Sequence, residues 1–161
     1  MGSSYDISID PGTSATGVCV WINGKPISSK IPTLRPPREL AFEDKLLWLR
    51  RRLIDLFSGV IGVDHTIGRI AVEQFTDQQG ASDKSTVFAK KVSMMKCSAI
   101  RGMILGLADD WAKEILHPNK RQIKKRETGW LAEHYGVSGS KDALDAFHLG
   151  IIAGFDKRRS Q

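Results

Sequence analysis

The chain has 161 residues, 41% of them hydrophobic and 26% charged, which suits one globular domain spanning 1–161 with a single core. Its net charge of +6 suits a polyanion such as nucleic acid, although basicity alone does not require one. The spacing of Cys19 and Cys97 indicates neither zinc nor a disulfide framework. The opening residues resemble no signal peptide and no stretch approaches ~18 apolar residues, so we expect a cytoplasmic protein without a membrane segment.

The first forty residues predict a three-stranded antiparallel meander. Apolar and polar residues alternate over 5–10, which is strand periodicity, and 17–22 is a second apolar run rich in β-branched residues. Asn23-Gly24 is a strong hairpin signal, so 25–31 is expected to be the third strand. A proline-rich loop is expected over 32–39.

The rest of the chain alternates between helices and strands. An apolar stripe at helical spacing covers 42–57, and further helices are expected over 84–109 and 141–158. Short apolar strands are expected over 69–73 and 111–116. This order predicts an α/β domain with a mixed five-stranded sheet, in which two further strands join the antiparallel meander and helices cover both faces.

Four carboxylates stand where such a sheet collects functional groups. Asp10 ends the first strand and Glu73 ends the fourth. Asp142 and Asp145 lie three residues apart near the start of the last helix, so their side chains share one face. Small alanines beside them let that helix approach the strand ends.

Each carboxylate alone has an ordinary explanation. Asp10 before Pro-Gly could begin a turn or hold a phosphate, and Glu73 could be a surface residue at a strand end. Either helix aspartate could be a favourable charge near a helix N-terminus. Four converging carboxylates would repel one another unless divalent cations neutralise them. Mg²⁺ prefers oxygen ligands, and two such ions ~4 Å apart assist phosphodiester cleavage.

Three segments resemble the RuvC family of Holliday junction resolvases: IDPGTSATG at 9–17, IAVEQF at 70–75 and KDALDAFHLG at 141–150. The resemblance covers most of the chain and implies an RNase H-like fold. It also implies a homodimeric endonuclease that resolves four-way DNA junctions by paired, symmetric nicks in recombination and repair. The implied cofactor is Mg²⁺ or Mn²⁺, with two ions per active site.

The family's catalytic, metal-binding carboxylates match Asp10, Glu73, Asp142 and Asp145. By this resemblance Asp10 bridges both ions and Asp142 helps to orient the attacking water. The short length and the departures below make the chain most similar to phage-encoded members, which would act in the cytoplasm of a bacterial host.

The expected dimer has a geometric reason. A two-fold dimer places one active site on each of two opposed strands of a junction. The helix from Lys84 to Ala108 is the expected interface, because its second half is apolar nearly all round.

Two departures from bacterial members affect the predicted DNA contacts. Phe75 follows the glutamate by two positions rather than three, so it could wedge against unpaired bases or be a core residue. KRQIKKRETGW at 120–130 replaces the bacterial segment before the last helix, and its basic residues are either phosphate contacts or a solvated charge run. The expected DNA-binding residues are Phe75, Lys84, Lys90, Lys91, Lys120, Arg121, Lys124, Lys125 and Arg126. The role of His148, either proton transfer or packing beside the sheet, stays open.

Other functions are weighed against this one. An actin-like or sugar-kinase-like ATPase would use GTSATG around a phosphate, but it needs a second phosphate loop and an adenosine-binding segment in about twice the length. A catalytically silent junction binder leaves the carboxylates unexplained, since acids weaken DNA binding unless metals neutralise them. Another RNase H-like nuclease, acting on flaps or RNA–DNA hybrids, is excluded least well by the sequence.

Overall fold

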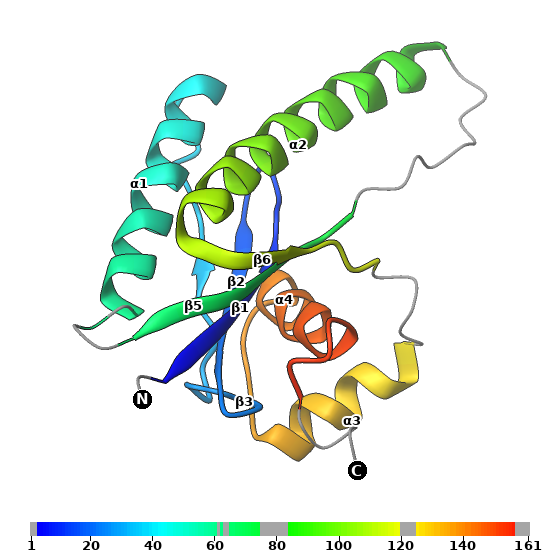
Figure 1. The fold of residues 1–161 in the computed structure, drawn as a ribbon. Coiled ribbons are helices and arrows are strands. Elements are labelled where there is room, and N and C mark those ends of the chain that lie inside the picture. Colours follow the sequence, from blue (N-terminus) through cyan, green and yellow to red (C-terminus); the bar gives the residue numbers. More distant parts are fainter. Residues whose placement is uncertain (1–2, 61, 63–64, 75–83, 120–124, 157–161) are drawn as a thin grey trace.

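The computed structural model describes residues 3–60, 62, 65–74, 84–119 and 125–156. Its elements are β1 (Ser4–Asp10), β2 (Thr16–Ile22), β3 (Lys25–Pro26), β4 (Thr33–Leu34), α1 (Phe42–Val60), β5 (Thr66–Val72), α2 (Lys84–Trp111), β6 (Ala112–Leu116), α3 (Lys125–Tyr135) and α4 (Lys141–Ile152). Figure 1 shows α1 and α2 on one face of the sheet and α4, with α3 beside it, on the other. The predicted coverage of both faces is confirmed. In these ranges no helix has the length and apolarity needed to span a membrane.

The sheet is mixed and has six strands, one more than predicted. The order is β3-β2-β1-β5-β6. β4 also pairs with β2, on the same edge as β3 but at the other end of the strand. β1 runs antiparallel to β2 and parallel to β5, and β5 runs parallel to β6. The carboxyl ends of β1, β5 and β6 therefore meet at one edge of the sheet, which is where α/β sheets commonly place their sites.

The third strand of the meander differs from the prediction of one strand over 25–31. The Asn23-Gly24 turn forms as expected, with both residues at positive φ, but β3 ends at Pro26. The chain then leaves β2 and bonds elsewhere, because Ile31 N–H donates to the carbonyl of Ser138 and Ser138 N–H donates to Ser29. It returns to β2 only at β4, inside the segment predicted as a proline-rich loop.

The helices and the parallel strands differ from prediction mainly at their ends. β5 begins three residues earlier than expected and ends at Val72, and α2 continues to Trp111 before β6 starts. α4 ends at Ile152 rather than at 158. Gly154 has a φ of 76°, and the N–H of Phe155 donates to the carbonyl of Gly150 at 2.9 Å. This is a glycine-terminated Schellman ending, which a helix cannot continue through.

The central strands are buried on both faces. Ile7 and Ile9 of β1 pack in one core cluster with α1 and α2, while Cys19 and Trp21 of β2 pack in a second cluster with α4. Ser8, on the second face, is fully buried and donates to the carbonyl of Ala146 at 2.6 Å, and Trp21 Nε1 donates to Ser8 Oγ at 2.9 Å. These bonds fix α4 against β1 and β2.

Candidate functional site

Asp10 and Glu73 occupy neighbouring positions at the carboxyl ends of β1 and β5. Asp10 is the last residue of β1 and is only 4% exposed. Glu73 directly follows β5, and its N–H donates to the carbonyl of Ile9 at 3.3 Å. The structure therefore places these two predicted carboxylates side by side along the sheet edge.

Strand alternation places both side chains on the face that carries α4. In β1, Ile7 and Ile9 face α1 and α2, and Ser8 faces α4, so Asp10 falls on the α4 side. In β5, Val72 belongs to the first cluster and Ala71 to the second, so Glu73 follows Ala71 onto the α4 side. Because side chains alternate between the two faces of a strand, a strand that is otherwise apolar can end on a carboxylate that faces α4.

The loop after Asp10 is a tight turn closed by its own side chains. The Thr16 hydroxyl lies 3.4 Å from both the N–H and the carbonyl oxygen of Gly12, at the start of β2. A Cβ at Gly12 would lie 2.3 Å from the carbonyl oxygen of Ala15. Gly12 and Thr16 of the IDPGTSATG segment are thus explained by the turn that holds Asp10.

The start of α4 comes very close to the same strand end. Ser140 caps the helix by accepting from Ala143 N–H at 3.3 Å. Gly17, the pairing partner of Asp10 in β2, has no side chain, and a Cβ there would lie 1.9 Å from the carbonyl oxygen of Asp142. The first turn of α4 therefore sits beside the strand pair that carries Asp10.

The two helix aspartates lie near basic side chains. Asp142 Oδ2 lies 4.0 Å from Nη2 of Arg35, and its side chain is 35% exposed. Asp145 Oδ2 accepts from Lys141 Nζ at 3.0 Å, and its side chain is 21% exposed. Arg35 follows β4, and no sequence pattern connects it to the acidic residues.

The donor set suits a hard divalent cation in its chemistry, since all four candidate ligands are carboxylates. The arrangement of the side chains meets the needs of a metal site less fully than their chemistry does. Across the described ranges, no three His, Cys, Asp or Glu side chains are arranged to hold one metal ion. The fold thus gathers the backbone positions of the four acidic residues, while their side chains are not turned onto one point.

The pKa of the Cys97 thiol on α2 depends on the charge at this edge. Burial raises the pKa of the thiol, and the negative charges of Glu73 and, to a smaller extent, Asp10 raise it further, while a hydrogen bond with Ser93 lowers it. The charge of these carboxylates therefore acts on α2 as well, although their side chains lie on the α4 side of the sheet. No motif or spacing in the sequence connects this cysteine to the site.

A polar hollow of about 420 Å³ lies between α2, the start of α1 and the turn after Asp10. It carries the ammonium groups of Lys45 and Lys96 and the hydroxyls of Thr13, Ser14 and Ser93. No acidic residue of the described chain lines it. Such a donor-rich surface beside the carboxylates suits a phosphate backbone. Lys45 and Lys96 were absent from the predicted DNA contacts, because only the fold brings them together.

The structure describes only some of the predicted DNA-binding residues. Lys90 and Lys91 are exposed on α2. Phe75, Lys120, Arg121 and Lys124 lie outside the described residues, as do the side chains of Lys84, Lys125 and Arg126. The last two residues of the basic run at 120–126 lie in α3, a helix that the sequence pattern does not predict. Leu131 and Ala132 of α3 are buried in the second core cluster.

His148, whose role was left open, is 7% exposed on α4 and packs its ring 5.3 Å from that of Phe147. This burial accords with a packing role beside the sheet.

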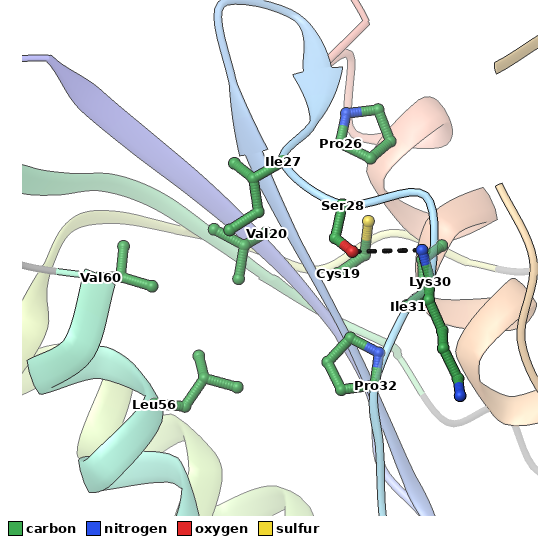
Figure 2. A pocket seen from close by; sticks show the side chains of 10 residues that line it. All are labelled: Cys19, Val20, Pro26, Ile27, Ser28, Lys30, Ile31, Pro32, Leu56 and Val60. Atoms are coloured by element: carbon green, nitrogen blue, oxygen red, sulfur yellow. Dashed lines mark hydrogen bonds between the residues drawn. The ribbon is translucent and has the colours of Figure 1, made fainter. Parts of the chain in front are cut away.

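A second hollow, about 290 Å³, lies at the β2 edge of the sheet and faces the last turns of α1 (Figure 2). Val20, Ile27, Leu56 and Val60 make it largely apolar, and Ser28 Oγ accepts from the backbone N–H of Lys30 at its rim. No carboxylate is among its described lining residues, so the candidate acidic site lies instead at the edge that carries Asp10 and Glu73.

Comparison with known proteins gives a likeness of fold. No protein-family model and no curated protein matches the chain. Among solved structures it is similar to T. thermophilus RuvC in complex with a Holliday junction substrate, with a TM-score of 0.68 and 12% identity over 97% of this chain and 96% of that one. A further Thermus thermophilus RuvC structure has a TM-score of 0.64 and 14% identity over the same shares. The expected α/β, RNase H-like fold is therefore confirmed.

Proposed function

We propose that the protein is a divalent-metal-dependent endonuclease that resolves four-way DNA junctions by paired, symmetric nicks. One observation carries the proposal: Asp10, Glu73 and the first turn of α4 meet at one edge of an RNase H-like sheet. The likeness to a RuvC solved with a Holliday junction supports the choice of substrate. The departures in 120–130 favour a phage-encoded protein acting in a host cell.

In this proposal Asp10 and Glu73 hold the metal from the strand ends, and Asp142 and Asp145 complete the set from α4. Bound Mg²⁺ or Mn²⁺ supplies an activated water and stabilises the leaving oxygen. Without a cation the helix aspartates are partly neutralised by basic neighbours. We expect them to turn toward Asp10 on loading, because the cation then removes the repulsion that keeps carboxylates apart.

The basic neighbours would then serve the substrate. Arg35 and Lys141, which lie beside Asp142 and Asp145, can then contact phosphate oxygens at the proposed cleavage position. Lys45 and Lys96 extend the same basic surface past the turn at Thr13 and Ser14. The basic residues of 120–126, and Phe75 as a stacking wedge, remain proposed DNA contacts.

The proposed homodimer uses α2. Figure 1 shows the first half of this helix projecting past the sheet. Phe88 and Met95 are 70% and 72% exposed and lie seven residues apart, so they share one helix face. Ala99 and Gly106 continue this face with small, exposed residues that allow close approach. One side of the second half packs in the protein's own core through Ile100, Ile104, Leu107 and Ala108, so the proposed interface uses the other side of the helix.

The substrate class is tested with matched labelled DNAs: a four-way junction, a linear duplex of the same sequence, a flap and an RNA–DNA hybrid. Each is incubated with Mg²⁺, Mn²⁺ or EDTA. We expect nicks only in the junction, at symmetry-related positions, and none with EDTA. Preferential cleavage of the flap or hybrid would assign another RNase H-like nuclease, and ATP hydrolysis without nicking would refute nuclease function.

A further inference from the structure

A third hollow, about 570 Å³, lies between α2 and the ends of β5 and β6. It is lined by Gln74, Ser98, Arg101, Gly102 and His117. The side chains carry an amide, a hydroxyl, a guanidinium and an imidazole, and none of the described lining residues is acidic. Gln74 directly follows the proposed ligand Glu73, so this hollow adjoins the carboxylate edge.

Arg101 is held rigidly in this hollow by two hydrogen bonds. Its Nε donates to the main-chain carbonyl of Glu73 at 2.8 Å, and its Nη2 donates to Nδ1 of His117 at 2.7 Å. Both acceptors are uncharged, and no carboxylate within the described ranges pairs with this guanidinium. Because arginine stays protonated, a full positive charge remains here with three of its five N–H groups uncommitted in these bonds.

The histidine adds a donor of fixed position. Nδ1 of His117 accepts from Arg101, so in the neutral ring the proton is carried by Nε2. Ser98 and Gln74 are exposed and add a hydroxyl and an amide, and Gly102 leaves the α2 side of the hollow without a side chain. A cluster of donors around a guanidinium that forms no ion pair with a described carboxylate favours an anion, and a guanidinium fork matches the oxygens of a phosphate.

We propose that this hollow binds a backbone phosphate of the DNA strand being cut, adjacent to the scissile phosphate. The proposal rests on the proposed nuclease function. Since the Arg101 guanidinium also holds the carbonyl of Glu73, the same side chain connects the bound strand to the main chain of a metal ligand. Arg101 is therefore a positioning residue as well as a phosphate contact, and it links β5, β6 and α2 at the site.

The first test needs no nuclease activity. The ring signals of His117 are followed by NMR in the full-length protein, assigned with His117→Asn, while inorganic phosphate is added. Chloride at equal ionic strength is the control. We expect a saturable shift with phosphate only, and its loss in Arg101→Gln. Equal responses to both salts, or an unchanged phosphate response in Arg101→Gln, would overturn the site.

The second test locates the phosphate on DNA. Junction binding is measured in Ca²⁺ with one methylphosphonate placed at each position near the cut in turn. One position should weaken binding by wild-type protein yet have no further effect on Arg101→Gln, whose salt slope should fall by about one. Arg52→Gln, on exposed α1, should keep the wild-type pattern. If Arg101→Gln remains sensitive to every position, the proposal is wrong. If wild-type protein binds no junction, the nuclease proposal fails, while the phosphate NMR still decides the site.

Discussion

At the scale of the residue, Cys97 links the carboxylate edge to α2, because its thiol lies within the field of Glu73 and Asp10. The other cysteine, Cys19, is 1% exposed and burial raises the pKa of its thiol as well. Only Cys97 is accessible enough to serve as a chemical reporter of the site in the folded protein.

Glu73→Gln should make Cys97 more reactive. Removing the negative charge lowers the pKa of the thiol, so at one fixed pH more of the reactive thiolate is present. The rate of alkylation of the native protein, measured by mass spectrometry, should rise several-fold for one thiol per chain. Glu133→Gln, on the exposed side of α3, is the control and should react as wild type does. An unchanged rate in Glu73→Gln would place Glu73 away from α2.

Gly17→Ala should disturb the site directly. The added methyl would lie 1.9 Å from the carbonyl oxygen of Asp142, so the start of α4 must move away from β2, the strand that pairs with the one carrying Asp10. We expect a loss of about 1–3 kcal/mol in the free energy of unfolding, measured in urea. Gly59→Ala is the control: nothing lies within 4 Å of that position in α1, so it should be neutral or slightly stabilising. Equal stability of the two variants would contradict the close approach.

At the scale of the element, α4 is positioned by polar as well as apolar contacts. Ser8 donates to α4 and accepts from Trp21, and Gly150 lets the helix lie directly on the indole, where a Cβ would come within 2.4 Å. A helix held in this way can present Asp142 and Asp145 to the strand ends with little freedom.

Ser8→Ala should therefore destabilise the fold. It removes one partner from the indole N–H of Trp21 and one from the carbonyl of Ala146, both at a buried position. Unfolding in urea should show a loss of about 1–3 kcal/mol. Ser58→Ala, on the exposed face of α1, should change stability by less than about 0.5 kcal/mol. A neutral Ser8→Ala would mean that these bonds do not hold α4.

The elements that were predicted correctly are those with long, regular patterns. Strand alternation located β1 and β2, and the apolar stripe located α1, because periodicity reflects burial directly. α3 was missed because its apolar residues are few and follow a basic run. The split between β3 and β4 was missed because it depends on hydrogen bonds to Ser138, a residue far away in sequence.

At the scale of the whole molecule, the neighbourhood of the carboxylates could be predicted only in part. Asp10 and Glu73 were expected to converge if the ends of their two strands were adjacent, and the parallel pairing of β1 with β5 makes them so. Arg35, Lys45 and Arg101 come from three separate segments and reach this edge only through the fold. No spacing in the sequence connects such single residues. The predicted phosphate contacts therefore came mainly from a basic cluster within one segment.

Oligomeric state tests the proposed use of α2. Met95→Lys places a charge in the exposed apolar face of this helix, so we expect the dimer to dissociate to monomers in size-exclusion chromatography with light scattering. Leu47→Lys alters a residue of α1 that is 53% exposed and should leave the dimer intact. A wild-type monomer at micromolar concentration, or a dimer unaffected by Met95→Lys, would exclude this interface.

The central claim, that the carboxylates at this edge cut DNA, is tested most directly with Asp145→Asn and a labelled four-way junction. Wild-type protein should nick two opposed strands with Mg²⁺. The variant should bind the junction in Ca²⁺ with wild-type affinity and cut it roughly a hundredfold or more slowly, because one charged ligand has been lost. Cleavage by Asp145→Asn at the wild-type rate, or an intact junction with wild-type protein in both Mg²⁺ and Mn²⁺, would contradict the claim.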